Sequence, residues 1–542
     1  MLSISGDILL LTDVLVIGGG AAGLRAAIAA RESGVDVILA SKAPMGYASS
    51  TLYAGGGFRA ALGDYSAERH FEETIIGGKF LNDQELVRTM VLEGPKRLLE
   101  LEKFGVKVYV HSGGIRVSAT PLINGYGLTK PLRDYAESIG IKFLEGVMAL
   151  DLIKDESVNG AVFYDISRNR LFIVKAKAVI LATGGYSQVF LRTDNPVRVS
   201  GDGCVMALKA GATLIDMEFV QFFPLGLAEK GFPAWLFPAS SGRLVNSVGE
   251  DILEKYGLNV NLYTAIIKFR DFTSRIIWRE IAEGRGIDEA VILELPTAPA
   301  DQIPVGFTGI SKVLAEAFKL KSNRIKVAPL AHFTMGGIKV NLDGETTVPG
   351  LYACGEVTGG VHGANRLGGN ALTEAIVFGA RTGVAAAKWV ENVTNLSEAD
   401  DDLIRRYEDL ISSFKNGRYK VKELRFRVKK AMWTNCGIIR DENKLNLLLK
   451  TLREVKDDLD EVYAFSRSEV LEAFELRNLL QVSEVVATSA LLRRESRGAH
   501  YRSDLPEQDD KEWLKHICIS LEDEEIMVNY EPVNLKYLGL KC

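Results

Sequence analysis

The sequence of 542 residues contains few cysteines and few histidines. Its five cysteines are scattered, and no two have the Cys-x-x-Cys spacing. This pattern is typical of buried thiols in an intracellular protein and argues against a disulfide framework or a metal site. If an iron–sulfur cluster takes part in the function, we therefore expect it in another chain. The cysteines are at positions 204, 354, 436, 518 and 542.

No uninterrupted apolar run approaches the ~18 residues that suggest a membrane-spanning helix. The apolar opening at residues 8–17 contains Asp13, lacks a basic region before it and leads straight into a glycine motif. These features favour a buried first strand over a signal peptide. A net charge of −5 gives no general attraction to nucleic acid or to an anionic membrane. We expect a cytoplasmic protein whose only route to a membrane is a partner subunit.

A dinucleotide-binding motif lies close to the N-terminus. An apolar strand at residues 12–17 is followed by Gly18-Gly-Gly20-Ala-Ala-Gly23 and then by a helical segment at residues 24–31. In this order the glycines and the helix start approach a pyrophosphate. The next strand, residues 35–40, ends in Ser41-Lys42, where an NAD site usually has an acidic residue for the ribose. The motif therefore favours FAD over NAD.

Two later segments have the same character. Residues 178–185 and 350–356 are apolar strands that run into glycines, as expected of strands that return to one nucleotide-binding sheet. A glycine-rich stretch at residues 330–374 contains His332, His362 and Arg366 and precedes a helical run at residues 371–390. Glycines and a helix start there suit a flat anionic ligand, although a crossover loop with incidental histidines is the alternative.

Further motifs make a family resemblance specific. They are Ser200-Gly-Asp-Gly203, residues 210–222, Phe269-Arg-Asp-Phe-Thr-Ser-Arg275 and Arg494-Glu-Ser-Arg-Gly-Ala-His-Tyr-Arg502. With the stretches above, and in the same order, they resemble the flavoprotein subunit of the succinate dehydrogenase and fumarate reductase family, which also includes L-aspartate oxidase. The resemblance runs from about residue 12 to about residue 516.

The resemblance implies an α/β FAD-binding Rossmann-like domain, interrupted by an α+β capping domain and followed by a C-terminal helical domain. It places the FAD-binding domain at residues 1–226 and 329–396, the cap at 227–328, and the helical domain and tail at 397–542. Four segments with charged faces and helical periodicity, between residues 398 and 492, agree with that last assignment.

FAD is the cofactor that the resemblance implies, held without a covalent bond. Respiratory members of the family attach the flavin to a histidine, and Ser50 stands at that place here, in a segment closer to the aspartate oxidase version. The residues expected to contact FAD are Gly18, Gly20, Ala22, Gly23, Ser41, Lys42, Ser50, Thr51, Gly56, Gly57, Ala182, Thr183, Gly184, Asp202, Gly355, Glu356, Arg366, Asn370, Ala371 and Leu372.

The same resemblance suggests how a four-carbon dicarboxylate is handled. Arg366 suits a carboxylate clamp because its guanidinium binds a carboxylate with two parallel hydrogen bonds, and we expect His332 and His362 beside it. The alternative for Arg366 is an ion pair with a buried acid. Arg270 matches the family's proton shuttle, although its spacing alone indicates a surface helix residue. Arg270, His332 and Arg366 are the candidate catalytic residues.

The other side of the expected pocket departs from the family. Phe223 replaces a substrate-binding histidine, and residues 234–243 lack the usual Thr-Glu segment, so Phe223, Leu225 and Trp235 are expected to form the wall there. Arg243 or Ser241 is the candidate for a compensating donor. Three functions stay open: a fumarate reductase or succinate dehydrogenase flavoprotein working with a separate iron–sulfur subunit, an L-aspartate oxidase-like enzyme, or an electron-relay subunit with a degenerate dicarboxylate site.

Overall fold

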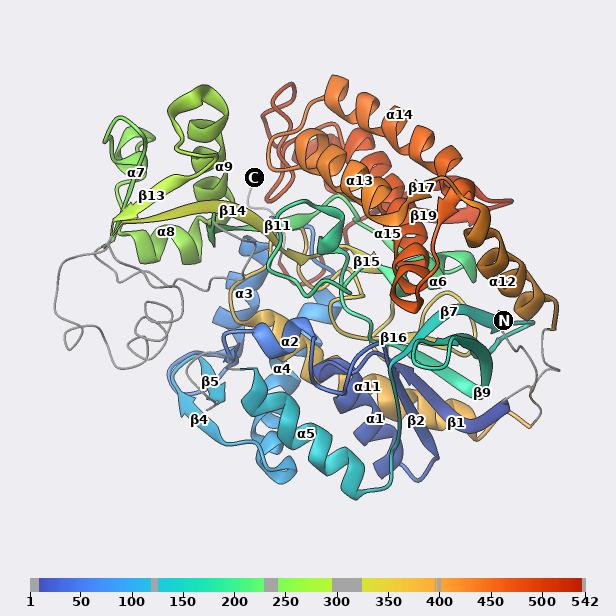
Figure 1. The fold of residues 1–542 in the computed structure, drawn as a ribbon. Coiled ribbons are helices and arrows are strands. Elements are labelled where there is room, and N and C mark those ends of the chain that lie inside the picture. Colours follow the sequence, from blue (N-terminus) through green and yellow to red (C-terminus); the bar gives the residue numbers. More distant parts are fainter. Residues whose placement is uncertain are drawn as a thin grey trace.

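The computed structural model describes residues 9–117, 125–228, 242–294, 324–394, 396 and 401–538 (Figure 1). Its largest sheet contains the three strands that the sequence predicts for one nucleotide-binding domain. Strand β1 (Leu9–Ile17) pairs in parallel with β9 (Arg170–Leu181), and β9 pairs in parallel with β16 (Leu351–Ala353). The other side of β1 carries β2 (Val37–Ser41) and then β6 (Lys142–Glu145), both parallel. The predicted single sheet is therefore confirmed.

The long strand β9 pairs with β1 along one edge and with two successive strands along the other. Its first half pairs antiparallel with β8 (Val158–Asp165), which pairs with β7 (Val147–Lys154), and its last residues pair with β16. Apolar side chains on its two faces enter different cores. One core includes α1 (Ala21–Glu32), α4 (Gln84–Leu99), α5 (Tyr126–Ser138) and α11 (Asn370–Val390). The other includes α6 (Asp202–Lys209) and the C-terminal helices.

Smaller elements follow β2 and complete the FAD-binding region on the side of α4. A short helix, the first strand of a three-stranded sheet and a second helix lie between β2 and α4 in the chain, and the other two strands of that sheet follow α4. These elements are α2 (Ser50–Tyr53), β3 (Gly57–Arg59), β4 (Val108–His111), β5 (Gly114–Val117) and α3 (Ala67–Gly77).

The capping region has its own sheet and core, and it projects to one side of the molecule (Figure 1). The strand order is β11 (Val220–Leu227), β14 (Arg324–Thr334), β13 (Val291–Glu294) and β12 (Arg243–Val245), all antiparallel. Because β11 and β14 pair along most of their length, the sheet extends across both predicted cap boundaries, at 226/227 and 328/329. The cap helices are α7 (Ile252–Lys255), α8 (Leu262–Lys268) and α9 (Arg270–Glu280).

The C-terminal region is helical at first and then returns to a sheet. Its helices are α12 (Asp401–Ser413), α13 (Val421–Cys436), α14 (Glu442–Asp458) and α15 (Arg467–Leu492), close to the four predicted segments (Figure 1). After α15, strand β19 (Lys515–Glu522) pairs with β20 (Glu525–Pro532) and with β10 (Leu214–Ile215). The predicted tail of the helical domain thus includes a β-hairpin attached to a much earlier segment.

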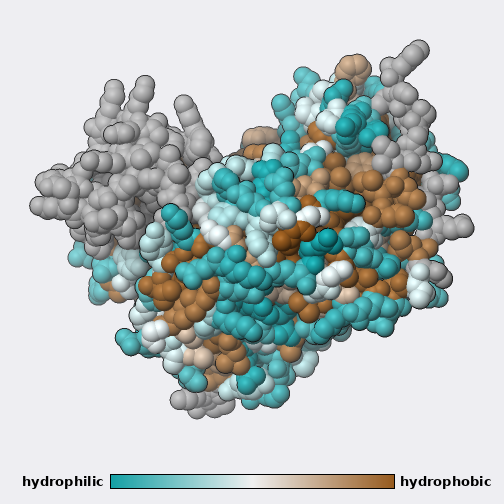
Figure 2. Space-filling model, turned by 90° about the horizontal axis from the view of Figure 1, so that it is seen from below, coloured by the Kyte–Doolittle hydropathy of each residue, from teal (hydrophilic) through white to brown (hydrophobic). Residues whose placement is uncertain are grey.

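Two further predictions concern buried and membrane-spanning residues. Cys204, Cys354, Cys436 and Cys518 are buried free thiols, as expected, and burial raises the pKa of Cys204 to about 12. Among the residues described, no helix combines the length and the apolar character needed to cross a membrane. On the face seen in Figure 2, patches of hydrophobic residues lie between areas of hydrophilic residues.

Candidate active site

A cavity of about 700 Å³ runs between the start of α1, the segment at residues 47–57, the start of α11 and the cap. Most of the predicted site residues line it, although they come from distant parts of the chain. From the cofactor set these are Gly18, Gly20, Ala22, Ser41, Lys42, Ser50, Thr51, Gly57, Ala182, Thr183, Gly184, Asp202, Gly355, Glu356, Arg366, Ala371 and Leu372; Arg270 and His332 also line the cavity.

Four predicted residues do not line this cavity, and each has another structural role or position. A Cβ at Gly23 would lie 1.8 Å from the Gly18 carbonyl oxygen, so Gly23 allows α1 to pack on β1. Asn370 is hydrogen-bonded to the His70 ring and to Thr74. His362 is buried with its ring edge-on to Phe333, at 5.2 Å between centroids. The remaining one, at position 56, is a glycine in the left-handed region, with φ of 68°.

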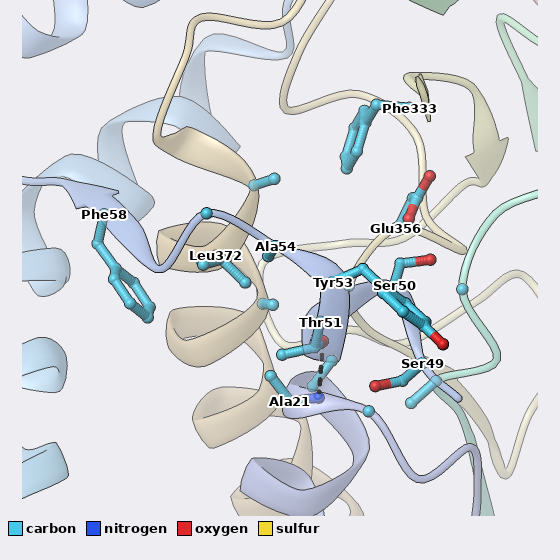
Figure 3. A pocket seen from close by; sticks show the side chains of 18 of the residues that line it. Ala21, Ser49, Ser50, Thr51, Tyr53, Ala54, Phe58, Phe333, Glu356 and Leu372 are labelled. Carbon is cyan, nitrogen blue, oxygen red and sulfur yellow. Dashed lines mark hydrogen bonds between the residues drawn. The ribbon is translucent and has the colours of Figure 1, made fainter. Parts of the chain in front are cut away.

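Two helix starts make the cavity suitable for a dinucleotide. The N-cap residues of α1 and α11 are Gly20 and Gly369. Since a glycine has no side chain, neither can accept a hydrogen bond from the first backbone N–H groups of its helix. Such helix starts attract anionic groups. Thr51 accepts a hydrogen bond from Ala21 N–H at 3.2 Å, which fixes the short helix α2 against the start of α1 (Figure 3). The residues present therefore fit FAD.

The segment around α2 lines the cavity with the small side chains of residues 49–51 and 54 and with the ring of Tyr53 (Figure 3). Among the described atoms, nothing lies within 4 Å of the place that a Cβ would take at Gly55 or Gly57, so ligand atoms can approach the backbone there. Ser50 donates a hydrogen bond to the Asn195 amide oxygen at 2.9 Å. A serine hydroxyl cannot replace the histidine that carries the covalent flavin bond in the resembled family.

Lys42 lines the cavity beyond β2, but its ammonium group is bound by carboxylates. Its Nζ lies 2.7 Å from Asp202 Oδ2 and 2.9 Å from Glu475 Oε1, and it also donates to the Arg198 carbonyl at 2.7 Å. Burial alone would lower the pKa of Lys42, but Asp202 and Glu475 raise it above its usual value. Lys42 therefore joins the end of β2 to helix α15, and this ion-pair group supports that end of the cavity.

At the cap side, two buried arginines share one acceptor. Gln221 Oε1 accepts hydrogen bonds from Arg270 Nη1 at 2.8 Å and from Arg366 Nη2 at 3.1 Å. The Gln221 amide nitrogen donates to the Arg366 carbonyl at 2.9 Å and to Asn365 Oδ1 at 2.8 Å, which fixes its orientation. The surface position that periodicity indicates for Arg270 is wrong, since only 6% of the residue is exposed.

The electrostatics of this pair follow from burial. Burial, together with the neighbouring Arg366, lowers the pKa of Arg270 to about 9. Burial likewise lowers the pKa of Arg366 to about 10, although Glu356 and Asp194 oppose the shift. A neutral amide bridges the two guanidinium groups. No carboxylate of the described residues forms an ion pair with either one, although Glu356 and Asp194 lie near enough to stabilise the charge of Arg366. Such an arrangement can bind an anion and can lend a proton.

His332 lies on β14 beside the arginine pair. Its Nδ1 is 2.7 Å from Asp194 Oδ2. Burial lowers the pKa of His332 below its usual value, although Asp194 opposes the shift, and Arg366 and Arg270 lower it further. The sequence prediction missed both Gln221 and Asp194. Gln221 belongs to one of the family motifs and could have been found there. No sequence pattern pointed to Asp194, because its partner His332 is 138 residues away.

Two buried carboxyl groups lie beneath the same region. Burial raises the pKa of Glu356 to about 7 against the opposing effect of the Thr334 N–H. Burial, with a contribution from Glu356, raises the pKa of Glu374 on α11 to about 8. Near neutral pH, Glu356 is partly protonated and Glu374 largely so. Glu356 was predicted to contact the cofactor, and Figure 3 shows it close to Phe333.

The sequence predicts that Phe223 and Leu225 form the wall of the pocket on this side, but neither lines the cavity and both belong to the cap core. The Phe223 ring has the Arg270 guanidinium 5.4 Å from its centroid and the His332 ring at 5.6 Å. Arg243 is half-exposed and paired with Asp251 at 3.1 Å. Arg243 therefore does not supply the compensating donor. Trp235, the third residue named for this wall, and Ser241, the other candidate donor, lie outside the described residues.

Comparisons with known proteins agree with this geometry. Residues 13–372 match the family model of an FAD binding domain, and residues 425–541 match that of the fumarate reductase flavoprotein C-terminus. An uncharacterized FAD-dependent oxidoreductase of Methanocaldococcus jannaschii is 39% identical, covering 94% of this chain and 96% of that protein. A fumarate reductase (CoM/CoB) subunit of Methanothermobacter marburgensis is 35% identical, with 94% of this chain and 97% of the relative covered.

Solved structures of similar fold include the flavoprotein chain of a fumarate reductase. The FrdA chain of E. coli quinol fumarate reductase is 30% identical and has a TM-score of 0.90, with 98% of each chain covered. An adenosine-5-phosphosulfate reductase, at 21% identity and a TM-score of 0.79, covering 99% of this chain and 98% of its own, shares the fold alone. The chain therefore belongs to the family of fumarate reductase and succinate dehydrogenase flavoprotein subunits, and it is an oxidoreductase with FAD as its cofactor.

Proposed function

We propose that this protein interconverts fumarate and succinate, or a closely related four-carbon dicarboxylate, as the flavoprotein subunit of a larger complex. One observation carries the proposal: two buried arginines donate to the same Gln221 oxygen, beside His332, at the wall of the FAD-type cavity. A small dianion that reacts at its central carbons needs cationic clamps and a proton donor at one place.

Arg366 and His332 are the residues for the carboxylate clamp. Arg366 follows the glycine-rich turn at residues 359–363, and its guanidinium lies 4.5 Å from the centroid of the Phe333 ring, which limits its rotation. A guanidinium held in this way presents two parallel N–H groups to a carboxylate. Since the group is buried, its attraction for an anion is screened less than that of a surface arginine.

Arg270 is the residue for proton transfer. It begins α9 in the cap, and its Nε is tied to the Ile266 carbonyl at 3.2 Å, so the Nη side faces Gln221 and the cavity. With a pKa of about 9, Arg270 is acidic enough to transfer a proton, whereas an arginine with the ordinary pKa is not. Bound FAD supplies the hydride donor and acceptor at its N5 position, and the cap excludes water from the reacting bond.

The proposed complex follows from the relatives. One similar protein bears the name of a fumarate reductase (CoM/CoB) subunit, and others are named as succinate dehydrogenase or fumarate reductase flavoprotein subunits. We propose that a separate iron–sulfur subunit exchanges electrons with the flavin of this chain. Because one relative is named a CoM/CoB fumarate reductase subunit, thiols are the first electron donors to test with the complex.

The test uses the FAD-loaded protein under anaerobic conditions, with a reduced viologen dye as electron donor. Arg270→Lys keeps the charge but not the reach, and we expect a loss of roughly 100-fold or more in fumarate reduction. FAD content and malonate binding should stay close to wild type. Arg279→Lys is the matched control, because Arg279 is on the same helix, exposed and paired with Glu283. Activity of Arg270→Lys within a few-fold of wild type contradicts the assignment.

A second candidate function has one observation in its favour. Phe223 packs against both Arg270 and His332 where a polar residue would hold the second carboxylate. An electron-relay subunit with a degenerate dicarboxylate site would show this feature. It predicts a flavin that exchanges electrons with dyes, while neither malonate nor fumarate changes its absorbance spectrum.

A further inference from the structure

The loop between η2 (Ser187–Val189) and α6 is fastened to strand β14 directly beside His332. Thr193 forms an isolated parallel bridge with Ala331. The Asp194 N–H donates to the Ala331 carbonyl at 3.2 Å, and the Ala331 N–H donates to the Arg192 carbonyl at 2.9 Å. The position of Asp194 relative to His332 is therefore set by the backbone and does not depend on a mobile side chain alone.

Asp194 and Asn195 together hold His332 at two points. Asp194 Oδ2 lies 2.7 Å from Nδ1 of the ring, and Asn195 Nδ2 donates to the His332 carbonyl at 2.8 Å. The Asn195 amide also donates to Asp194 Oδ1 at 3.1 Å, which orients the carboxylate. Asp194 and Asn195 are both buried.

Asn195 also contacts the flavin side of the cavity. Its Oδ1 accepts the hydrogen bond from Ser50 on α2, and its carbonyl accepts one from Gln188 Nε2 at 2.7 Å. Gln188 in turn accepts a hydrogen bond from Lys429 on α13 at 2.6 Å. His332, the α2 segment that lines the cavity and the C-terminal helices are thus connected through Asp194 and Asn195.

We propose that Asp194 is a positioning residue for His332: it engages Nδ1, so that Nε2 meets the substrate carboxylate and the ring binds the substrate as an imidazolium between two carboxylates. Binding of a dicarboxylate then takes up one proton from solvent. This inference rests on the proposed role of His332 in the carboxylate clamp. It adds a proton to the binding step and names the residue that makes this uptake possible.

The charges around His332 determine the direction of the pH dependence. Asp194 from the loop before α6 favours the imidazolium, whereas Arg270 from α9, Arg366 from the glycine-rich turn and burial favour the neutral ring. The ligand-free ring is therefore neutral at pH 7. A bound carboxylate offsets the two arginines, so the pKa of the ring rises on binding. Above that raised pKa, the dissociation constant should increase about tenfold per pH unit.

The experiment measures malonate binding to the anaerobic FAD-loaded protein by calorimetry in buffers of different ionisation enthalpy. For wild type at pH 7 we expect uptake of about one proton per malonate, and for Asp194→Asn an uptake near zero with a flat pH profile. Asp194→Glu should restore part of the uptake. Glu356→Gln, used only with full FAD loading, removes another carboxyl group that titrates near pH 7 and tests whether the proton binds there instead.

Asp165→Asn is the matched control. Asp165 is a buried aspartate that closes the turn after β8 and does not line the cavity. If Asp194→Asn keeps its FAD and still takes up one proton per malonate, the proposal is wrong. If the uptake disappears in Glu356→Gln instead, the proton binds to Glu356 and the proposal is equally wrong.

A measurement on the ligand-free protein separates this inference from the proposed function. In long-range ¹H–¹⁵N spectra of protein labelled at histidine, the His332 signals, assigned with His332→Gln, should show the proton on Nδ1. Asp194→Asn should alter that pattern, and Asp165→Asn should not. If malonate does not bind to wild type, the proposed function fails while this spectrum still tests the pairing. An unchanged pattern in Asp194→Asn overturns the role of Asp194.

Discussion

The Gln221 amide bridges Arg270 and Arg366 without adding charge, so Gln221→Glu tests the proton-donor role with a change of one atom. The new carboxylate would lie where Oε1 now accepts from Arg270 Nη1 at 2.8 Å. Opposite charges about 4 Å apart attract by about 4 kcal/mol at an effective dielectric constant of about 20. One pKa unit corresponds to about 1.4 kcal/mol, so the upper limit for the rise in the pKa of Arg270 is about 3 units.

The cost of burying the new carboxylate reduces that effect, and we expect a rise of roughly 2 units. A stronger base is a weaker acid, so Arg270 would release its proton less readily, and fumarate reduction should slow by roughly 100-fold. The reverse reaction needs the neutral guanidine, so the pH at which succinate oxidation becomes fast should move upward by the same amount. FAD content should not change.

The assay is viologen-linked fumarate reduction and dye-linked succinate oxidation, each measured across pH. Gln84→Glu is the matched control, since Gln84 is also a buried glutamine whose Oε1 accepts two hydrogen bonds, from the backbone of Tyr537 and Leu538. A Gln221→Glu protein with full FAD and a rate within about threefold of wild type would show that the acidity of Arg270 does not limit the reaction.

Three other predictions follow from the site. Acid precipitation should release one FAD per chain, because Ser50 cannot form a histidyl bond; flavin retained in a denaturing gel would contradict this. Phe223→His should tighten malonate binding in an anaerobic flavin titration, because a buried ligand carboxylate without a hydrogen-bond donor costs about 1–3 kcal/mol. Weaker binding in the variant would mean that another donor already binds that carboxylate in wild type. Glu475→Gln should lower the free energy of unfolding by at most about 3–5 kcal/mol, because Arg425 loses its buried partner and Lys42 keeps only Asp202. Burial alone would raise the pKa of Glu475, but the neighbouring cations hold it below its usual value. The loss of unfolding free energy should therefore be complete above the pKa of an unfolded glutamate, about 4.3, and should shrink as the pH falls. Denaturant unfolding measures it, and a loss that grows in acid would contradict the prediction.

The sequence allowed the parallel centre of the nucleotide-binding sheet to be predicted because β1, β9 and β16 each carry a local signal, whereas β6, β7 and β8 were not predicted. Glycines follow β1, β9 and β16 at the points where the backbone approaches the cavity, and those signals do not depend on distant residues. The family motifs likewise brought Arg270, His332 and Arg366 to one cavity. Local periodicity alone gave the wrong exposure for Arg270, because a cap packed over a polar helix start buries a side chain that an isolated helix would expose.

What the sequence could not reveal is the set of contacts between polar residues far apart in the chain. The bridge at Gln221 joins it to Arg366 across 145 residues, and Asp194 reaches His332 across 138. Lys42 was predicted to contact the cofactor from its position after β2, whereas its ammonium group pairs with carboxylates of α6 and α15. Such pairs depend on tertiary packing, for which spacing and composition give no signal.

The pairing of Lys42 with Glu475 has a consequence for the order of events during synthesis. The two residues are 433 positions apart, and at about 5–20 residues per second the ribosome makes Glu475 roughly 20–90 s after Lys42. Strand β19 joins β10 later still. Until Glu475 is made, Lys42 can pair with Asp202 only, and the contact that joins this end of the cavity to helix α15 is missing. We therefore expect tight flavin binding to require the completed chain, and a chain truncated before α15 to bind FAD more weakly.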